Sequence, residues 1–131
     1  MTNIYVIGIG LIGGSMALDI KALYPEAKIY GIDANEKHVQ EAIDLGIIDA
    51  KANFSDLINA DWVIVSVPVD AALTIVPKAL DHIGEEAVVF EVGSTKRLIC
   101  EAVADHPKRR NYIATHPIAG TEFSGPSAAI L

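Results

Sequence analysis

The sequence predicts an α/β fold in which a mainly parallel, doubly wound sheet carries helices on both faces. Short apolar runs bounded by turn residues alternate with segments of helical periodicity along most of the 131 residues. The central run, Asp61 to Val67 (DWVIVSV), is continuous in apolar residues, as expected for a strand buried on both faces. Neither an internal repeat nor a low-complexity linker interrupts the pattern, so we expect one domain over residues 1–131.

The first two strands and helices are expected in strict alternation. Asn3 to Ile9 (NIYVIGI) reads as the first strand, and Gly10 opens a helix whose apolar residues recur at helical spacing. Lys28 to Ile32 (KIYGI) is the second strand. A helix follows from Glu36 to Leu45, and Gly46 ends it because glycine readily adopts the backbone conformation that closes a helix.

The middle of the chain leads into the buried central strand. Before it we expect a short strand and then one or two helical turns, over Ile47 to Ala50 and Asn53 to Ala60. The central strand ends at Pro68, which cannot donate a ladder hydrogen bond. A helix begins at Asp70, and Pro77 should break or restart it because proline lacks the N–H that the helix needs.

The last regular elements expected are a strand, a helix and a strand, over Ala87 to Val92, Thr95 to Ala104 and Tyr112 to Thr115. From Gly120 the pattern decays into GTEFSGPSAAIL, which contains no further strand. We therefore expect the chain to be the front part of a longer protein, with the domain truncated before its closing strands.

Composition excludes several classes of partner. The net charge of −7 argues against nucleic acid and against an anionic membrane surface, since both require a basic face. No apolar run approaches the ~20 residues of a membrane span. The lone Cys100 allows neither an intrachain disulfide nor a cysteine metal cluster, which fits a reducing compartment. The first strand has no basic leader before it, so we expect a cytoplasmic protein.

A glycine-rich turn follows the first strand. Gly8, Gly10 and Gly13 spell G-x-G-x-x-G, in which the three glycines permit a tight turn, close approach to a pyrophosphate and close helix–strand packing, respectively. The phosphates would lie on the N–H groups at the positive end of the helix. The candidate cofactor-binding residues here are Gly8, Gly10, Leu11, Ile12 and Gly13.

Asp33 supplies the acidic partner that such a turn requires. It lies at the end of the second strand, twenty residues beyond Gly13, where the ribose-binding acid of a Rossmann-type fold is expected. Its carboxylate would accept hydrogen bonds from the ribose hydroxyls and repel a 2′-phosphate. The next residues, Ala34 to Glu36, contain no arginine, so the sequence predicts NAD rather than NADP.

Three further clusters follow the ends of parallel strands, where ligands of this fold bind: Ser66 to Pro68, Gly93 to Lys96 and His116 to Glu122. We take Ser66, Val67 and Pro68 as cofactor-binding. Ser94 either faces the nicotinamide end of the crevice or only caps the next helix. His116 is a candidate proton acceptor, because histidine titrates near neutral pH. It has no second ligand at metal-binding spacing, so we expect no metal.

Four motifs occur in order along the chain: Gly8-Ile9-Gly10-Leu11-Ile12-Gly13-Gly14-Ser15, Ser66-Val67-Pro68, Gly93-Ser94-Thr95-Lys96, and His116-Pro117-Ile118-Ala119-Gly120-Thr121-Glu122 with Ser124-Gly125. Together they resemble the prephenate/arogenate dehydrogenases of tyrosine biosynthesis over nearly the whole chain. The His116 to Glu122 string is the most specific part of the resemblance, and the glycine turn is the least specific. Thr95 departs mildly, because the family often has valine there.

The resemblance implies NAD-dependent oxidative decarboxylation of prephenate to 4-hydroxyphenylpyruvate, or of arogenate to tyrosine. Hydride would leave the ring carbon bearing the 4-hydroxyl, and carbon dioxide would depart as the ring becomes aromatic. His116 matches the histidine that takes up the hydroxyl proton, and Ser94 matches a serine that contacts substrate, histidine and nicotinamide. Thr121 matches a substrate-contacting threonine. Lys96 and Glu122 belong to the motifs without an assigned chemical step.

The resemblance also implies that this chain lacks a domain that family members have. Family members continue into a helical domain that forms a homodimer and supplies an arginine for the substrate carboxylates. We therefore expect this chain to be the cofactor-binding half, which binds NAD but turns over prephenate poorly or not at all. Prephenate and arogenate both stay open as substrates. Two alternatives are another NAD-dependent dehydrogenase and a non-catalytic NAD-binding module.

Overall fold

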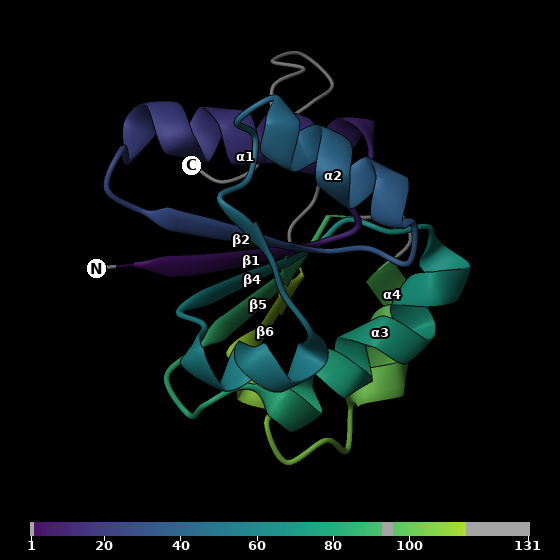
Figure 1. Cartoon of the computed structure of the whole chain (residues 1–131). Coiled ribbons are helices and arrows are strands. Elements are labelled where there is room, and N and C mark those ends of the chain that lie inside the picture. The colour runs from purple at the N-terminus through teal and green to yellow at the C-terminus, as the bar shows by residue number, and fades with distance from the viewer. Residues whose placement is uncertain (1, 93–95, 115–131) are drawn as a thin grey trace.

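The protein folds around a six-stranded parallel sheet with helices on both faces (Figure 1). The computed structural model describes residues 2–92 and 96–114. The strand order is β3-β2-β1-β4-β5-β6, and each neighbouring pair runs parallel. The strands are β1 (Asn3–Ile7), β2 (Lys28–Ile32), β3 (Ala50–Lys51), β4 (Trp62–Val65), β5 (Val88–Glu91) and β6 (Tyr112–Ala114). The predicted Rossmann-type, doubly wound α/β fold is confirmed.

Helices α1 (Leu11–Leu23) and α2 (Glu36–Asp44) cover one face of the sheet (Figure 1). Their apolar residues recur at intervals of three and four, which places them on the side of each helix that meets the strands. The buried side chains of this layer are Met16, Ala17, Ile20, Val39 and Ala42 from the helices, packed with Ile4, Val6, Ile29 and Ile64 from the strands. This core fixes where the first turn of α1 meets the end of β1.

The other face carries η1 (Phe54–Asn59), α3 (Val69–His82) and α4 (Lys96–Val103) (Figure 1). A short turn, η2 (Arg109–Asn111), precedes β6. The second core contains Leu57, Ala72, Val76, Ala79, Leu80, Ile99 and Val103 against Tyr5, Ile7, Val63, Val65 and Val89. Within residues 2–92 and 96–114, none of the helices combines the length and apolar character that crossing a membrane requires.

The direction of winding reverses between β1 and β4, which are hydrogen-bonded neighbours. The chain moves outward from β1 through β2 to β3, then returns to place β4 on the other side of β1. At this point Gly8 N–H donates to the Ile32 carbonyl over 2.8 Å, and Ser66 N–H donates to the Ile7 carbonyl over 2.8 Å. The carboxyl ends of β2, β1 and β4 are therefore fixed side by side, where ligands of this architecture bind.

The prediction that Pro77 breaks or restarts its helix is wrong. Helix α3 runs without interruption from Val69 to His82 with Pro77 inside it. Proline removes one hydrogen bond from the ladder, but the turns before and after it both bury apolar side chains on the same core, including Val76 and Leu80. Burial on both sides of the proline outweighs the missing bond and keeps the helix continuous.

The short strand near the sheet edge is shifted relative to the prediction. The sequence predicts Ile47 to Ala50, whereas β3 consists of Ala50 and Lys51, which pair with Tyr30 and Gly31. The apolar run itself precedes the strand, and Ile48 is buried against α1 and α2 without joining the sheet. Hydrophobicity therefore indicates burial here and does not locate the strand.

Candidate functional site

The turn between β1 and α1 begins at a glycine that no other residue can replace without strain. Gly8 has a φ of 91°, in the region that L side chains rarely adopt. A Cβ at this position would lie 2.6 Å from Val67 Cγ1 and would also overlap the Ser66 carbonyl oxygen. Gly8 is thus required by the close approach of β1 to the end of β4.

Gly13 serves the packing of α1 on the turn. A Cβ here would overlap the carbonyl oxygen of Gly8 and would lie 3.3 Å from Val6 Cγ1. The absence of a side chain therefore lets the first turn of α1 descend onto the end of β1. This matches the role that the sequence pattern assigns to the third glycine.

Gly10 differs from both, because the protein's own packing does not require it. Its φ of −90° is ordinary for any residue, and it is the N-cap of α1. A Cβ there would meet no heavy atom within 4 Å among the described residues beyond its chain neighbours. The space beside Gly10 is open, as close approach of a ligand backbone to this turn would need.

The N-terminus of α1 has the features of an anion-binding site. Leu11 and Ile12 form its first turn, in which neither a side-chain cap nor an acidic residue is found within the described structure. The first N–H groups of a helix have no partner in the helix itself and carry its positive dipole. Open space at Gly10 and an uncapped helix start therefore suit the phosphates of a dinucleotide.

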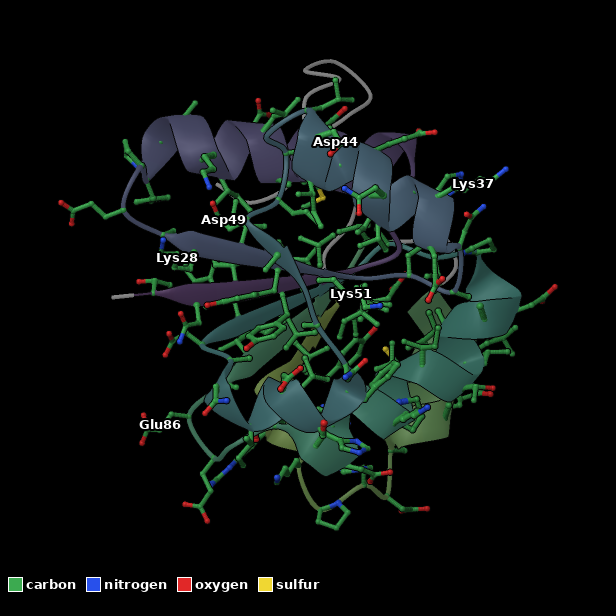
Figure 2. All side chains as sticks on the ribbon, in the orientation of Figure 1. Lys28, Lys37, Asp44, Asp49, Lys51 and Glu86 are labelled. Atoms are coloured by element: carbon green, nitrogen blue, oxygen red, sulfur yellow. The ribbon has the colours of Figure 1, made fainter. Side chains whose placement is uncertain are left out.

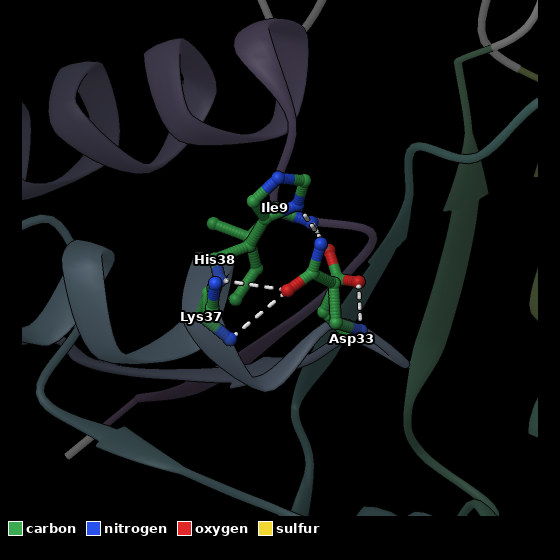
Figure 3. Close-up of polar contacts among 5 residues, drawn as sticks. Ile9, Asp33, Lys37 and His38 are labelled. Atoms are coloured by element: carbon green, nitrogen blue, oxygen red, sulfur yellow. Dashed lines mark hydrogen bonds and ion pairs between the residues drawn. The ribbon is translucent and has the colours of Figure 1, made fainter.

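Asp33 is held in a fixed orientation at the end of β2 (Figure 3). Its Oδ2 accepts a hydrogen bond of 2.8 Å from the Ile9 N–H, and its Oδ1 accepts one of 2.9 Å from the Asn35 N–H. The side chain is 16% exposed. Each carboxylate oxygen can accept more than one hydrogen bond, so both remain able to receive ribose hydroxyls. The ribose-binding acid predicted from the sequence thus lies directly beside the glycine turn.

Asn35 orients the backbone that holds Asp33. It is the N-cap of α2, and its Oδ1 accepts hydrogen bonds from the N–H groups of Lys37 and His38 at 3.0 and 3.4 Å (Figure 3). The first turn of α2 therefore places His38 Nδ1 3.8 Å from Asp33 Oδ2. The sequence analysis assigns no role to either His38 or Asn35. The Asp-x-Asn pattern before a helix was the available signal for Asn35.

The residues after β4 lie on the other side of the glycine turn. Ser66 and Val67 are half-buried against Gly8, and Pro68 is the exposed N-cap of α3. The structure therefore brings Gly8, Gly10, Gly13, Asp33, Ser66 and Val67 together at the carboxyl ends of β1, β2 and β4. Leu11 and Ile12 contribute described backbone to this cluster, at the start of α1.

The candidate catalytic and substrate-binding residues Ser94, His116 and Thr121 lie outside the described residues. The strands that precede them are adjacent and parallel, with Glu91 of β5 paired with Ala114 of β6. Among the described residues, no group of three or more histidine, cysteine, aspartate or glutamate side chains is arranged to hold a metal ion.

Comparison with known proteins places this chain in a sequence family. Residues 16–130 match the family described as "Prephenate dehydrogenase, nucleotide-binding domain". A prephenate dehydrogenase of Bacillus subtilis is 39% identical over 133 aligned positions, covering 97% of this chain and 35% of that protein. A cyclohexadienyl dehydrogenase of Zymomonas mobilis is 30% identical, covering 96% of this chain and 44% of that protein.

A solved structure shares the fold as well as the sequence. Prephenate dehydrogenase from A. aeolicus, in complex with hydroxyphenyl propionate and NAD+, superposes with a TM-score of 0.79 at 35% identity. The alignment covers 93% of this chain and 43% of that one. The chain thus spans less than half the length of these relatives. With its sheet order, its glycine turn and these alignments in agreement, the chain belongs to the prephenate dehydrogenase family and corresponds to its nucleotide-binding domain.

Proposed function

We propose that this chain binds NAD at the carboxyl ends of β1, β2 and β4, between the glycine turn, Asp33 and the segment after β4. The observation that carries the proposal is the contrast between the glycines. Gly8 and Gly13 are required by internal packing, whereas Gly10 leaves open space at the uncapped start of α1. That space, with Asp33 tied to Ile9 N–H beside it, matches the pyrophosphate and ribose of a dinucleotide.

NAD is favoured over NADP by the charge of Asp33. The carboxylate is only 16% exposed, and two backbone N–H groups fix its orientation. A 2′-phosphate at this position would bring about two further negative charges against it. The A. aeolicus relative binds NAD+ with the same fold, which supports this assignment.

We infer that the domain serves an NAD-dependent oxidative decarboxylation of prephenate or arogenate. When bound, NAD supplies the hydride acceptor. His116 takes the proton of the ring 4-hydroxyl, which requires its neutral imidazole. Ser94 orients that hydroxyl and His116, and Thr121 contacts the substrate. The support for these three roles is the motif resemblance, together with the pairing of the two strands that precede Ser94 and His116.

The chain covers 35% of the Bacillus relative and 43% of the A. aeolicus chain, so we assign it the cofactor-binding half of the reaction. Residues 1–131 then form a dinucleotide-binding domain. We propose that a dimer-forming part of the enzyme reads the substrate carboxylates, and that the isolated chain turns over prephenate poorly or not at all. A prephenate dehydrogenase and a cyclohexadienyl dehydrogenase both align with this chain. We therefore keep both prephenate and arogenate as candidate substrates.

Cofactor binding is tested by calorimetric titration of the 131-residue chain with NAD. We expect one saturable site per chain and weaker binding after Asp33→Ala. Absence of NAD binding by the folded chain would overturn the proposal.

The reaction is tested in the longest natural chain that carries this sequence, with prephenate and arogenate offered separately. We expect His116→Asn to abolish turnover of both while NAD affinity is retained. Unchanged turnover would remove His116 from the mechanism. Efficient turnover by residues 1–131 alone would contradict the assignment of this chain as half of the catalytic unit.

A further inference from the structure

Asp33 is flanked by basic side chains from two different elements. From α2, His38 Nδ1 lies 3.8 Å from Asp33 Oδ2. From β3, Lys51 lines a pocket of about 200 Å³ that Asp33 and Glu36 also line. Figure 2 shows Lys51 between α2 and η1, at the centre of the view. The carboxylate to which we assign the ribose hydroxyls therefore has one basic side chain 3.8 Å away and another lining the same pocket, and both are potential phosphate ligands.

The side chains of His38 and Lys51 are much more exposed to solvent than that of Asp33. The Asp33 side chain is 16% exposed, whereas those of His38 and Lys51 are 49% and 58% exposed. Lys51 Nζ lies 3.8 Å from Glu36 Oε1, but Glu36 is 85% exposed, so this pair is weak and easily exchanged for another anion. Both basic groups are thus free to turn toward an anion that arrives from solvent.

The charges around Asp33 determine whether NAD or NADP binds more tightly. NAD presents two hydroxyls to Asp33, whereas NADP presents a 2′-phosphate that carries about two negative charges. The repulsion from Asp33 opposes NADP, whereas the positive charge of Lys51 and a hydrogen bond from the His38 imidazole favour it. The residues directly after Asp33, Ala34 to Glu36, include no arginine, but the structure supplies basic groups from His38 of α2 and Lys51 of β3.

We propose that His38 and Lys51 are specificity-determining residues at the ribose end of the cofactor site, and that Asp33 alone keeps them from forming a 2′-phosphate site. The proposal rests on NAD binding at this site. It assigns the rejection of NADP to a single carboxylate, in surroundings that otherwise suit a phosphate. Replacing Asp33 by a neutral residue should therefore shift the cofactor preference of this chain from NAD toward NADP without any added basic residue.

The test compares the affinities of the 131-residue chain for NAD and NADP by calorimetric titration at physiological ionic strength, about 0.15 M. We expect Asp33→Asn to raise the ratio of NADP to NAD affinity about tenfold or more, because repulsion of a multiply charged group is removed. Asp33→Ser is run beside it, since the amide group of asparagine would face the N–H donors of Ile9 and Asn35. In either Asp33 variant, adding His38→Ala or Lys51→Ala should lower the ratio of NADP to NAD affinity about threefold.

The matched control is Lys28→Ala, which removes one lysine at the opposite end of β2 (Figure 2). Asp33 lies five positions further along the chain, about 16 Å away, which is beyond the Debye length at physiological salt. It should leave the NADP to NAD ratio unchanged. A further arm keeps Asp33 and replaces both His38 and Lys51 by alanine, which should weaken the residual binding of NADP to the wild-type chain.

The outcomes separate this proposal from the one that it rests on. If the wild-type chain binds no NAD, the proposed function is wrong. If it binds NAD but neither Asp33 variant gains NADP affinity, the specificity proposal is overturned and NAD binding stands. The specificity proposal is equally overturned if NADP binding is unaffected by His38→Ala and Lys51→Ala, or if Lys28→Ala lowers it as much as they do.

Discussion

The Asp33 carboxylate accepts a hydrogen bond of 2.8 Å from the backbone N–H of Ile9, 24 residues earlier in the chain. This contact joins the end of β2 to the turn that leads into α1. The carboxylate that we propose to bind ribose and the turn that we propose to bind the phosphates are therefore held in one geometry. Such preorganisation reduces the entropy that binding must overcome.

Gly8→Ala should destabilise the fold. The substitution places a Cβ 2.6 Å from Val67 Cγ1 at a φ of 91°, so either β4 or the turn must move. We expect the free energy of unfolding to fall by about 2 to 4 kcal/mol, measured by urea denaturation. Gly14→Ala is the matched control inside α1, where no described residue crowds the new methyl group. It should stabilise the chain by about 0.5 to 1 kcal/mol. Equal effects of Gly8→Ala and Gly14→Ala on stability would contradict the conclusion that position 8 requires glycine.

Asn35→Ala should weaken both α2 and cofactor binding. It removes the acceptor for the N–H groups of Lys37 and His38, which costs about 1 kcal/mol of folding stability. The Asn35 N–H that orients Asp33 then belongs to a frayed helix start, so NAD affinity should fall severalfold. Asn35→Ser retains a capping oxygen and should restore both properties. If Asn35→Ala lowers stability, and Asn35→Ser restores it, while NAD affinity stays the same in both variants, Asn35 has no role in orienting Asp33.

Asp49 should make stability depend on pH in the acidic range. Its carboxylate pairs with Lys21 and accepts a hydrogen bond of 2.9 Å from the Ile29 N–H. Burial raises the pKa of Asp49, but the bonds from Lys21 and Ile29, with the charges of Lys21 and Lys28, outweigh burial and hold it below its ordinary value of 3.8. The unfolded chain therefore binds the proton more readily. The stabilisation is complete well above pH 3.8 and is lost as the pH falls through that value toward the lower folded pKa.

Asp49→Asn tests this dependence by chemical denaturation at several pH values. The variant should lose about 1 kcal/mol of stability at pH 7, because both groups are partly exposed and solvent screens the pair. Its stability should then fall less steeply than that of the wild type as the pH is lowered below about 5. Asp44→Asn removes an equal charge from an exposed site on α2 and is the control (Figure 2). Parallel curves for wild type and Asp49→Asn would contradict the coupling.

Local patterns in the sequence predict much of this fold. The β2 strand is found over the predicted residues 28–32, because five consecutive residues there combine strand-forming side chains with clear turn signals on both sides. The position of Asp33 also follows from sequence, since a parallel strand leaving the sheet at its carboxyl end must present the next residue to the crevice. Pro77 was misjudged because its cost is local, whereas the burial that offsets it comes from distant strands.

The candidate site was predictable where glycine spacing fixes it and less so where contacts are tertiary. The contact between His38 and Asp33 depends on how α2 starts, which in turn depends on the cap formed by Asn35. The role of Lys51 depends on β3, whose position hydrophobicity misplaced. Neither relationship has a sequence signal of its own, because both arise from packing between elements.

Gly10→Ala, studied by thermal unfolding and by titration with NAD, tests the proposed cofactor site most directly. Gly10 has an ordinary φ of −90° and open space around its Cα, so the fold should tolerate alanine with a change in Tm of at most about 3 °C. The added methyl group would occupy the space assigned to the pyrophosphate, so NAD affinity should fall about tenfold or more. A Gly10→Ala chain that remains folded and binds NAD as tightly as the wild type would contradict the proposed site.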